Sequence, residues 1–168
     1  MLWRGRRGSE WAITSHMVGE RFVLIDPDTA TTPDLPVAAL NNDVTVLASG
    51  LGDSVPVAAS VAVTGASVLP PAPVHLAAAR ESDGSVMLSW VRRSRQGWHW
   101  IDGVDVPLVE ESERYRIAIH PPTGLASEME TTAPVATLAA SACPAGSMIE
   151  VAQIGNAGAS RPAAITCN

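Results

Sequence analysis

The chain has 168 residues, 46% of them apolar but only 4% aromatic, so aliphatic side chains must build most of its core. A net charge of −6 argues against nucleic acid or an anionic membrane surface as a general partner, since both bind basic faces. No run approaches the roughly 20 consecutive apolar residues that cross a bilayer, and we expect no membrane insertion. This length accommodates one compact domain, or a domain of roughly 100 residues and a smaller one.

Short segments rich in β-branched residues recur along the chain, separated by 13 prolines and 13 glycines. This spacing leaves few windows for helices and predicts an all-β fold. The expected strands are residues 21–25, 44–48, 57–63, 86–91, 114–120, 148–154 and 163–167. Alanine is frequent in residues 134–142, where a helix is the open alternative.

The clearest boundary is the segment 69–73 (LPPAP), in which three of five residues are proline. Proline lacks an amide hydrogen and fixes φ, so such a run follows an extended path outside strands and helices. The prediction is therefore a β-rich segment at 1–69, a proline-rich linker at 70–73 and a second domain at 74–168.

The second domain shows the alternation of a half-buried strand. Val86, Leu88 and Trp90 lie on one face of their segment, and Tyr115 and Ile117 repeat the pattern. Residues 155–158 (GNAG) are typical of a hairpin turn. Together these segments predict a two-sheet β-sandwich of about 95 residues.

The two cysteines follow from this fold prediction. If segments 148–154 and 163–167 pair through the 155–158 turn, Cys167 returns to the neighbourhood of residues 145–147, close to Cys143. Cys143 and Cys167 are therefore a candidate disulfide. Closing about 25 residues would contribute on the order of 3–4 kcal/mol in the chain-entropy model. Two unpaired, buried thiols are the alternative.

The connection at 92–113 concentrates charge and aromatic residues. Arg92, Arg93 and Arg95 are expected to pair across a β-ribbon with nearby acids, and such exposed pairs contribute about 0–1 kcal/mol each. The acids are Asp102, Asp105, Glu110, Glu111 and Glu113.

Trp98, His99 and Trp100 lie at the tip of the same connection. Tryptophan is enriched at binding hot spots, so these residues, with the three arginines, are the candidate interaction site. The alternative is that both indole rings fold back and cap the end of the sandwich.

No catalytic, cofactor or metal site is expected. The four histidines, His16, His75, His99 and His120, are scattered without metal-ligand spacing. The chain also lacks a nucleophile elbow and a phosphate-binding loop. We therefore expect a protein that is not an enzyme.

Several segments resemble a fibronectin type III domain. They are the proline-led strand 73–76 (PVHL), the strand 86–90 (VMLSW) and the segments 115–117 and 151–162. The resemblance covers residues 73–168 and implies a fibronectin-III-like β-sandwich. The connection at 92–113 departs from it as a long insertion.

A second resemblance covers the whole chain. Residues 2–11 (LWRGRRGSEW), 19–24 (GERFVL), 88–95 (LSWVRRSR) and 106–115 (VPLVEESERY) resemble the C-terminal region of tail-tip, or baseplate hub, proteins of gene transfer agents and siphophages. It implies a structural protein of a particle's tail tip, made in the bacterial cytoplasm, with residues 1–69 as a remnant of a hub barrel.

That resemblance also implies partners. They are copies of the chain itself, other tail or baseplate proteins and a host cell-surface glycan. The alternative function is a carbohydrate-binding accessory module of a cell-wall-active protein.

Overall fold

The computed structural model describes residues 9–10, 13, 15–22, 33–95 and 105–168. These residues form strands, turns and short 3-10 segments, and none of them is in an α-helix. The chain divides into two compact units, Met1–Ser67 and Val68–Asn168, and each is described by itself. The predicted linker at 70–73 belongs to the second unit, where its three prolines are buried.

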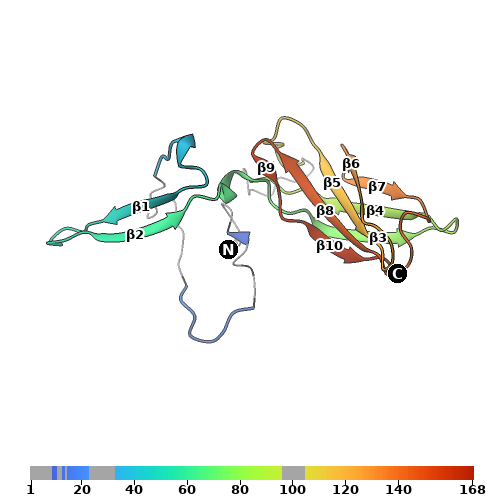
Figure 1. Ribbon diagram of the computed structural model, residues 1–168, viewed down its shortest axis with the longest axis horizontal. Coiled ribbons are helices and arrows are strands. Elements are labelled where there is room, and N and C mark those ends of the chain that lie inside the picture. Colours follow the sequence, from blue (N-terminus) through green and yellow to red (C-terminus); the bar gives the residue numbers. More distant parts are fainter. Residues whose placement is uncertain (1–8, 11–12, 14, 23–32, 96–104) are drawn as a thin grey trace. The chain divides into compact units, whose positions relative to one another are not determined.

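The second unit consists of antiparallel sheets drawn in Figure 1. One sheet has the order β3-β4-β7, and the other has the order β10-β8-β5-β6, with β9 paired to β8. The strands are β3 (Val74–Arg80), β4 (Val86–Val91), β5 (Tyr115–His120), β6 (Ser127–Thr131), β7 (Val135–Leu138), β8 (Met148–Gly155), β9 (Gly158–Ala159) and β10 (Ala163–Thr166). The predicted all-β fold with a C-terminal sandwich is confirmed.

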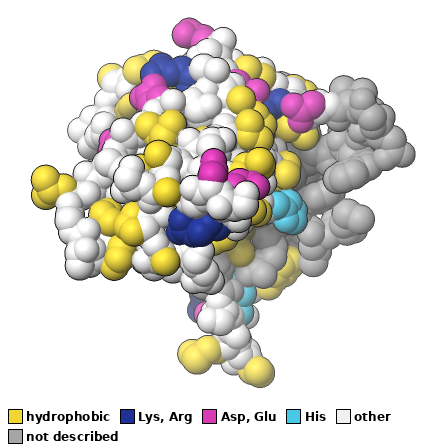
Figure 2. Space-filling view, turned by 90° about the vertical axis from the view of Figure 1, so that its right-hand side faces the viewer, with side chains coloured by type: hydrophobic (Ala, Val, Ile, Leu, Met, Phe, Trp, Pro, Cys, Tyr) yellow, Lys and Arg dark blue, Asp and Glu magenta, His cyan; other side chains and the backbone are white. Residues whose placement is uncertain are grey.

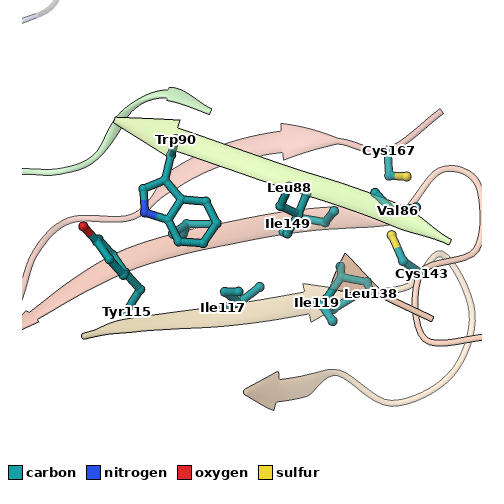
Figure 3. Close-up of a cluster of buried hydrophobic side chains, with 11 residues drawn as sticks. Val86, Leu88, Trp90, Tyr115, Ile117, Ile119, Leu138, Cys143, Ile149 and Cys167 are labelled. Atoms are coloured by element: carbon teal, nitrogen blue, oxygen red, sulfur yellow. The ribbon is translucent and has the colours of Figure 1, made fainter. Parts of the chain in front are cut away.

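The core lies between these two sheets. Side chains on β4 alternate strictly between buried and exposed, as the sequence predicts, and every second residue of β5 is buried. The buried cluster runs from Trp90 and Tyr115 at one end to Cys143 and Cys167 at the other (Figure 3). Trp90 and Tyr115 meet edge to face with ring centroids 5.1 Å apart, a favourable geometry for aromatic pairs.

Three strands were not predicted, and one expected strand is described only at its first two residues. Residues 134–142 contain strand β7 and a turn, so the helical alternative there is wrong. Strand β6 is largely exposed and acidic, and β9 has two residues, so neither shows a strong pattern in the sequence. Arg21 and Phe22 are not in a strand, and the rest of the expected strand 21–25 lies outside the described residues.

Strand β3 contains a bulge that no pattern in the sequence predicts. Its pairing with β4 shifts between Val74 and Ala77, so β3 has one residue more than its partner over this stretch. His75 lies in the bulge with a φ of 53°, a left-handed conformation that is uncommon for residues other than glycine.

In the first unit, β1 (Asp43–Ala48) and β2 (Val57–Ala62) form an antiparallel hairpin. Both strands were predicted. None of the described residues of Met1–Ser67 is buried, so this unit supplies no part of the described core.

Candidate functional site

The charged connection between β4 and β5 is anchored first by Arg92. This residue follows the last residue of β4, and its side chain is only 7% exposed. Its Nη2 atom donates to Asp105 Oδ2 at 2.6 Å and to the carbonyl of Val106 at 2.7 Å. Its Nε atom lies 3.6 Å from Glu113 Oε1. The Arg92 guanidinium therefore links the start of the connection to residues in its second half.

Glu113 extends this contact into the core. The hydroxyl of Tyr115 donates to Glu113 Oε1 at 2.7 Å. Burial, together with the hydrogen bond and negative charge of Glu113, raises the pKa of Tyr115 far above its ordinary value. Tyr115 therefore keeps its proton and acts as a fixed donor between the aromatic core and the charged connection.

Arg95 and Glu110 form the second anchor. Arg95 Nε donates to Glu110 Oε1 at 2.8 Å, and the Glu110 side chain is only 3% exposed. Glu110 Oε2 accepts the backbone N–H of Asn156 at 3.0 Å, and Asn156 Oδ1 accepts the N–H of Glu111 at 2.9 Å. Burial alone would raise the pKa of Glu110, but these hydrogen bonds and the charge of Arg95 lower it overall.

Gly155 makes room for this second anchor. A Cβ atom on Gly155 would lie 2.6 Å from Glu110 Oε2 and 2.8 Å from Pro70 Cδ. In the same turn, a Cβ on Gly158 would lie 3.0 Å from Leu69 Cδ2. The glycines of the predicted hairpin turn thus admit both the carboxylate and the start of the proline run.

The predicted pairing of the arginines with nearby acids is confirmed for Arg92 and Arg95. The prediction that these pairs are exposed is wrong for Arg92 and Glu110, which are both buried. Arg92 directly follows β4, and Glu110 contacts the backbone of Asn156 in the turn between β8 and β9. Arg93 Nη1 donates to the carbonyl of Ala72 at 3.5 Å.

The expected β-ribbon is also absent from the described part of the connection, residues 92–95 and 105–113, which is irregular. Trp98, His99, Trp100 and Asp102 lie outside the described residues. The interaction role of this connection stays a prediction.

A second candidate surface lies on the hairpin β1–β2. Residues paired across an antiparallel ladder point to the same side, so the register defines its two faces. One face, here called the valine face, carries only Val44, Val46, Ala48, Val57, Ala59 and Val61. Val57 and Val61 are 69% and 55% exposed. The opposite face is mixed, and Thr45 and Ser60 pair there through their hydroxyls at 2.8 Å.

The sequence pattern predicted the two strands but not their shared apolar face. Segments 44–48 and 57–63 indicated strands, but a single strand does not reveal which residues of the other strand share its side. Only the register, in which Val46 lies opposite Ala59 and Val44 opposite Val61, gathers the apolar residues on one face.

Other chemistry is sparse in the part of the chain that the structure describes. No group of three or more His, Cys, Asp and Glu residues there could hold a metal ion. His120 lies 3.2 Å from Glu150, and His16 contacts Glu20.

No helix among the described residues is long and apolar enough to cross a membrane. On the face drawn in Figure 2, acidic and basic side chains are scattered and form no single charged patch.

Comparison with known proteins gives likenesses of structure only. No protein-family model matches the chain, and no curated protein matches it. A fibronectin type III domain of human collagen XX is similar over 57% of this chain and 90% of its own, with 20% identity and a TM-score of 0.40. Domains d3–d4 of the rat CD45 extracellular region are similar over 90% of this chain and 76% of their own, with 10% identity and a TM-score of 0.41.

A segment of two fibronectin type III domains from chicken tenascin is similar over 73% of this chain and 61% of its own, with 12% identity and a TM-score of 0.41. These likenesses concern the fold alone. The assignment of the sandwich rests on the strand order and registers of this chain.

Proposed function

We propose that this chain is a structural part of the tail tip of a phage or gene transfer agent. The sequence supports this proposal through the four segments that resemble such tail proteins. In this role the first unit assembles with further copies of the chain and with other tail proteins. The sandwich is a spacer or docking module, and the 92–113 connection makes its outer contacts.

The single observation that carries an assembly role is the valine face of hairpin β1–β2. A two-stranded sheet by itself is marginally stable in water and needs a covering layer. The valine face carries no charge or hydrogen-bonding side chain, so its covering surface must also be uncharged. The same face of a second copy meets this requirement, and we assign it as the occupant.

Self-association tests the assembly role directly. The wild-type chain is expected to form concentration-dependent oligomers in sedimentation velocity runs. Val46→Asp places a charge on the valine face and should weaken association at least about tenfold. Thr45→Asp places the same charge on the opposite face and is the matched control. A monomeric wild type, or equal weakening by both variants, contradicts the assignment.

The tail-tip location needs a separate experiment. Proteins of purified particles are separated by gel electrophoresis, and each band is analysed for peptides of this chain by mass spectrometry. Finding the peptides in a particle protein supports the proposal. Finding them only in a free protein absent from particles overturns it, and the carbohydrate-binding module then becomes the leading function.

A further inference from the structure

The two cysteines lie together at the end of the core farthest from the Trp90–Tyr115 pair (Figure 3). Cys143 belongs to the turn after β7, and Cys167 directly follows β10. Both thiols are free and buried, and both belong to the same hydrophobic cluster. The tail-tip function proposed above uses neither of them.

Backbone and side-chain contacts hold this pair in place. Cys167 donates its N–H to the carbonyl of Ser147 at 2.8 Å and accepts the N–H of Gly146 at 2.6 Å. Arg80 Nη2 lies 3.0 Å from the carbonyl oxygen of Cys143 and 3.2 Å from the sulfur of Cys167. The predicted return of the last strand to residues 145–147 is therefore confirmed.

We propose that Cys143 and Cys167 form an intramolecular disulfide when the chain meets a small-molecule disulfide such as oxidised glutathione. The bond joins the end of β10 to the turn that contains Cys143. It does not depend on the tail-tip function.

The position of β10 explains why such a bond matters. This strand is only four residues long and lies at the edge of its sheet, in the order β10-β8-β5-β6. Short edge elements open locally at little cost in free energy, and such opening exposes Cys167 to a soluble oxidant. Once the disulfide has formed, β10 can no longer separate from the sandwich.

The environment of the two sulfurs assigns the order of the steps. Burial, then the contact with Cys167, raises the pKa of Cys143. The guanidinium of Arg80 lies beside the Cys167 sulfur and compensates the negative charge of a thiolate there. Cys167 is therefore the attacking residue and Cys143 the resolving one.

The reaction balances as a thiol–disulfide exchange. The Cys167 thiolate attacks one sulfur of oxidised glutathione, which breaks the S–S bond and releases one glutathione thiolate. Cys143 loses its proton to solvent and attacks the mixed disulfide at the Cys167 sulfur, which releases the second. Two protein thiols are oxidised, and one glutathione disulfide is reduced to two glutathione molecules.

The test uses the purified full chain, equilibrated in glutathione buffers of rising oxidised fraction. Oxidised chain should lose both free thiols and the mass of two hydrogen atoms, and remain a single chain on a non-reducing gel. Its melting temperature should rise by roughly 10 °C or more above that of the reduced chain. Cys143→Ala and Cys167→Ala should show no such redox-dependent shift.

Arg80→Met tests the role of the guanidinium, with the exposed Arg161→Met as its control. Arg80→Met should slow the exchange with oxidised glutathione several-fold, and Arg161→Met should not. The proposal is overturned if the wild-type chain keeps both thiols in the most oxidising buffer after transient unfolding. It is also overturned if oxidation yields linked dimers, or leaves the melting temperature unchanged.

Discussion

Glu110 shows how a single residue can tie a long connection to a sandwich. Its carboxylate is buried, yet it accepts one hydrogen bond from Arg95 and one from the backbone of Asn156. A buried charge with such partners is tolerated because its lost hydration is replaced, whereas removing a partner leaves an unpaired polar group.

Glu110→Gln keeps the size of the side chain but removes its charge. We expect the free energy of unfolding to fall by about 1–3 kcal/mol, because Arg95 then lacks its ionic partner. Urea denaturation followed by circular dichroism measures this change. The exposed neighbour Glu111→Gln should change stability by less than about 0.5 kcal/mol. Equal effects of the two variants would refute the anchoring role of Glu110.

The same residue predicts a dependence of stability on acid. The pKa of Glu110 in the folded chain lies below its ordinary value of 4.5, so the unfolded chain binds a proton more readily. Its contribution to stability is therefore complete above the ordinary value and is lost as pH falls through the folded value.

Melting temperatures measured from pH 7 downward should show this loss in the acid range, and the loss should be smaller in Glu110→Gln. The pKa of Asp83 is also lowered, mainly by its hydrogen bond from the Ser85 hydroxyl, so part of the loss persists in the variant. Identical acid profiles of wild type and variant would show that Glu110 does not contribute.

At the scale of elements, strand β4 supplies three side chains of the core, as many as β5. Its inward residues Val86, Leu88 and Trp90 are all buried, and Met87 between them is 48% exposed. β4 also pairs with both β3 and β7, so it is the central strand of its sheet.

Leu88→Ala is expected to destabilise the chain by about 2–5 kcal/mol, because it removes buried methyl groups and leaves a cavity between the sheets. Met87→Ala, one residue earlier on the opposite face, should cost less than about 1 kcal/mol. Chemical denaturation of both variants measures the difference. A cost for Met87→Ala as large as that for Leu88→Ala would mean that the outer face of β4 is covered.

At the scale of the whole molecule, stability is concentrated in one unit. The described buried residues all belong to Val68–Asn168, and the proline run packs against the turn that contains Gly155. The hairpin β1–β2 instead presents apolar side chains to the outside.

A chain of residues 68–168 should therefore fold by itself. Its cooperative thermal transition is expected within about 3 °C of the main transition of the full chain, because its core is complete without the first unit. Circular dichroism melts of the two chains make the comparison. A fragment that fails to fold, or melts far below the full chain, would place essential core contacts in residues 1–67.

Local patterns in the sequence were sufficient for the main strands of the sandwich. Alternation identified the inward faces of β4 and β5, and the turn at 155–158 correctly predicted that β8 and β10 pair. Strands β6 and β7 were not predicted from the sequence. Each lies at the edge of its sheet and buries few side chains, so its residues need not alternate between apolar and polar.

The sequence by itself determined the all-β class, the strands β4, β5 and β8 that supply most of the core, and the approach of Cys167 to residues 145–147. These features depend on the two-residue period of a strand and on turn chemistry, which are local. Only the tertiary structure decided that Arg92 and Glu110 are buried, that Gly155 admits Glu110 and Pro70, and that the valines of β1 and β2 share one face. Those facts depend on register and on contacts between segments far apart in the chain, which no local pattern contains.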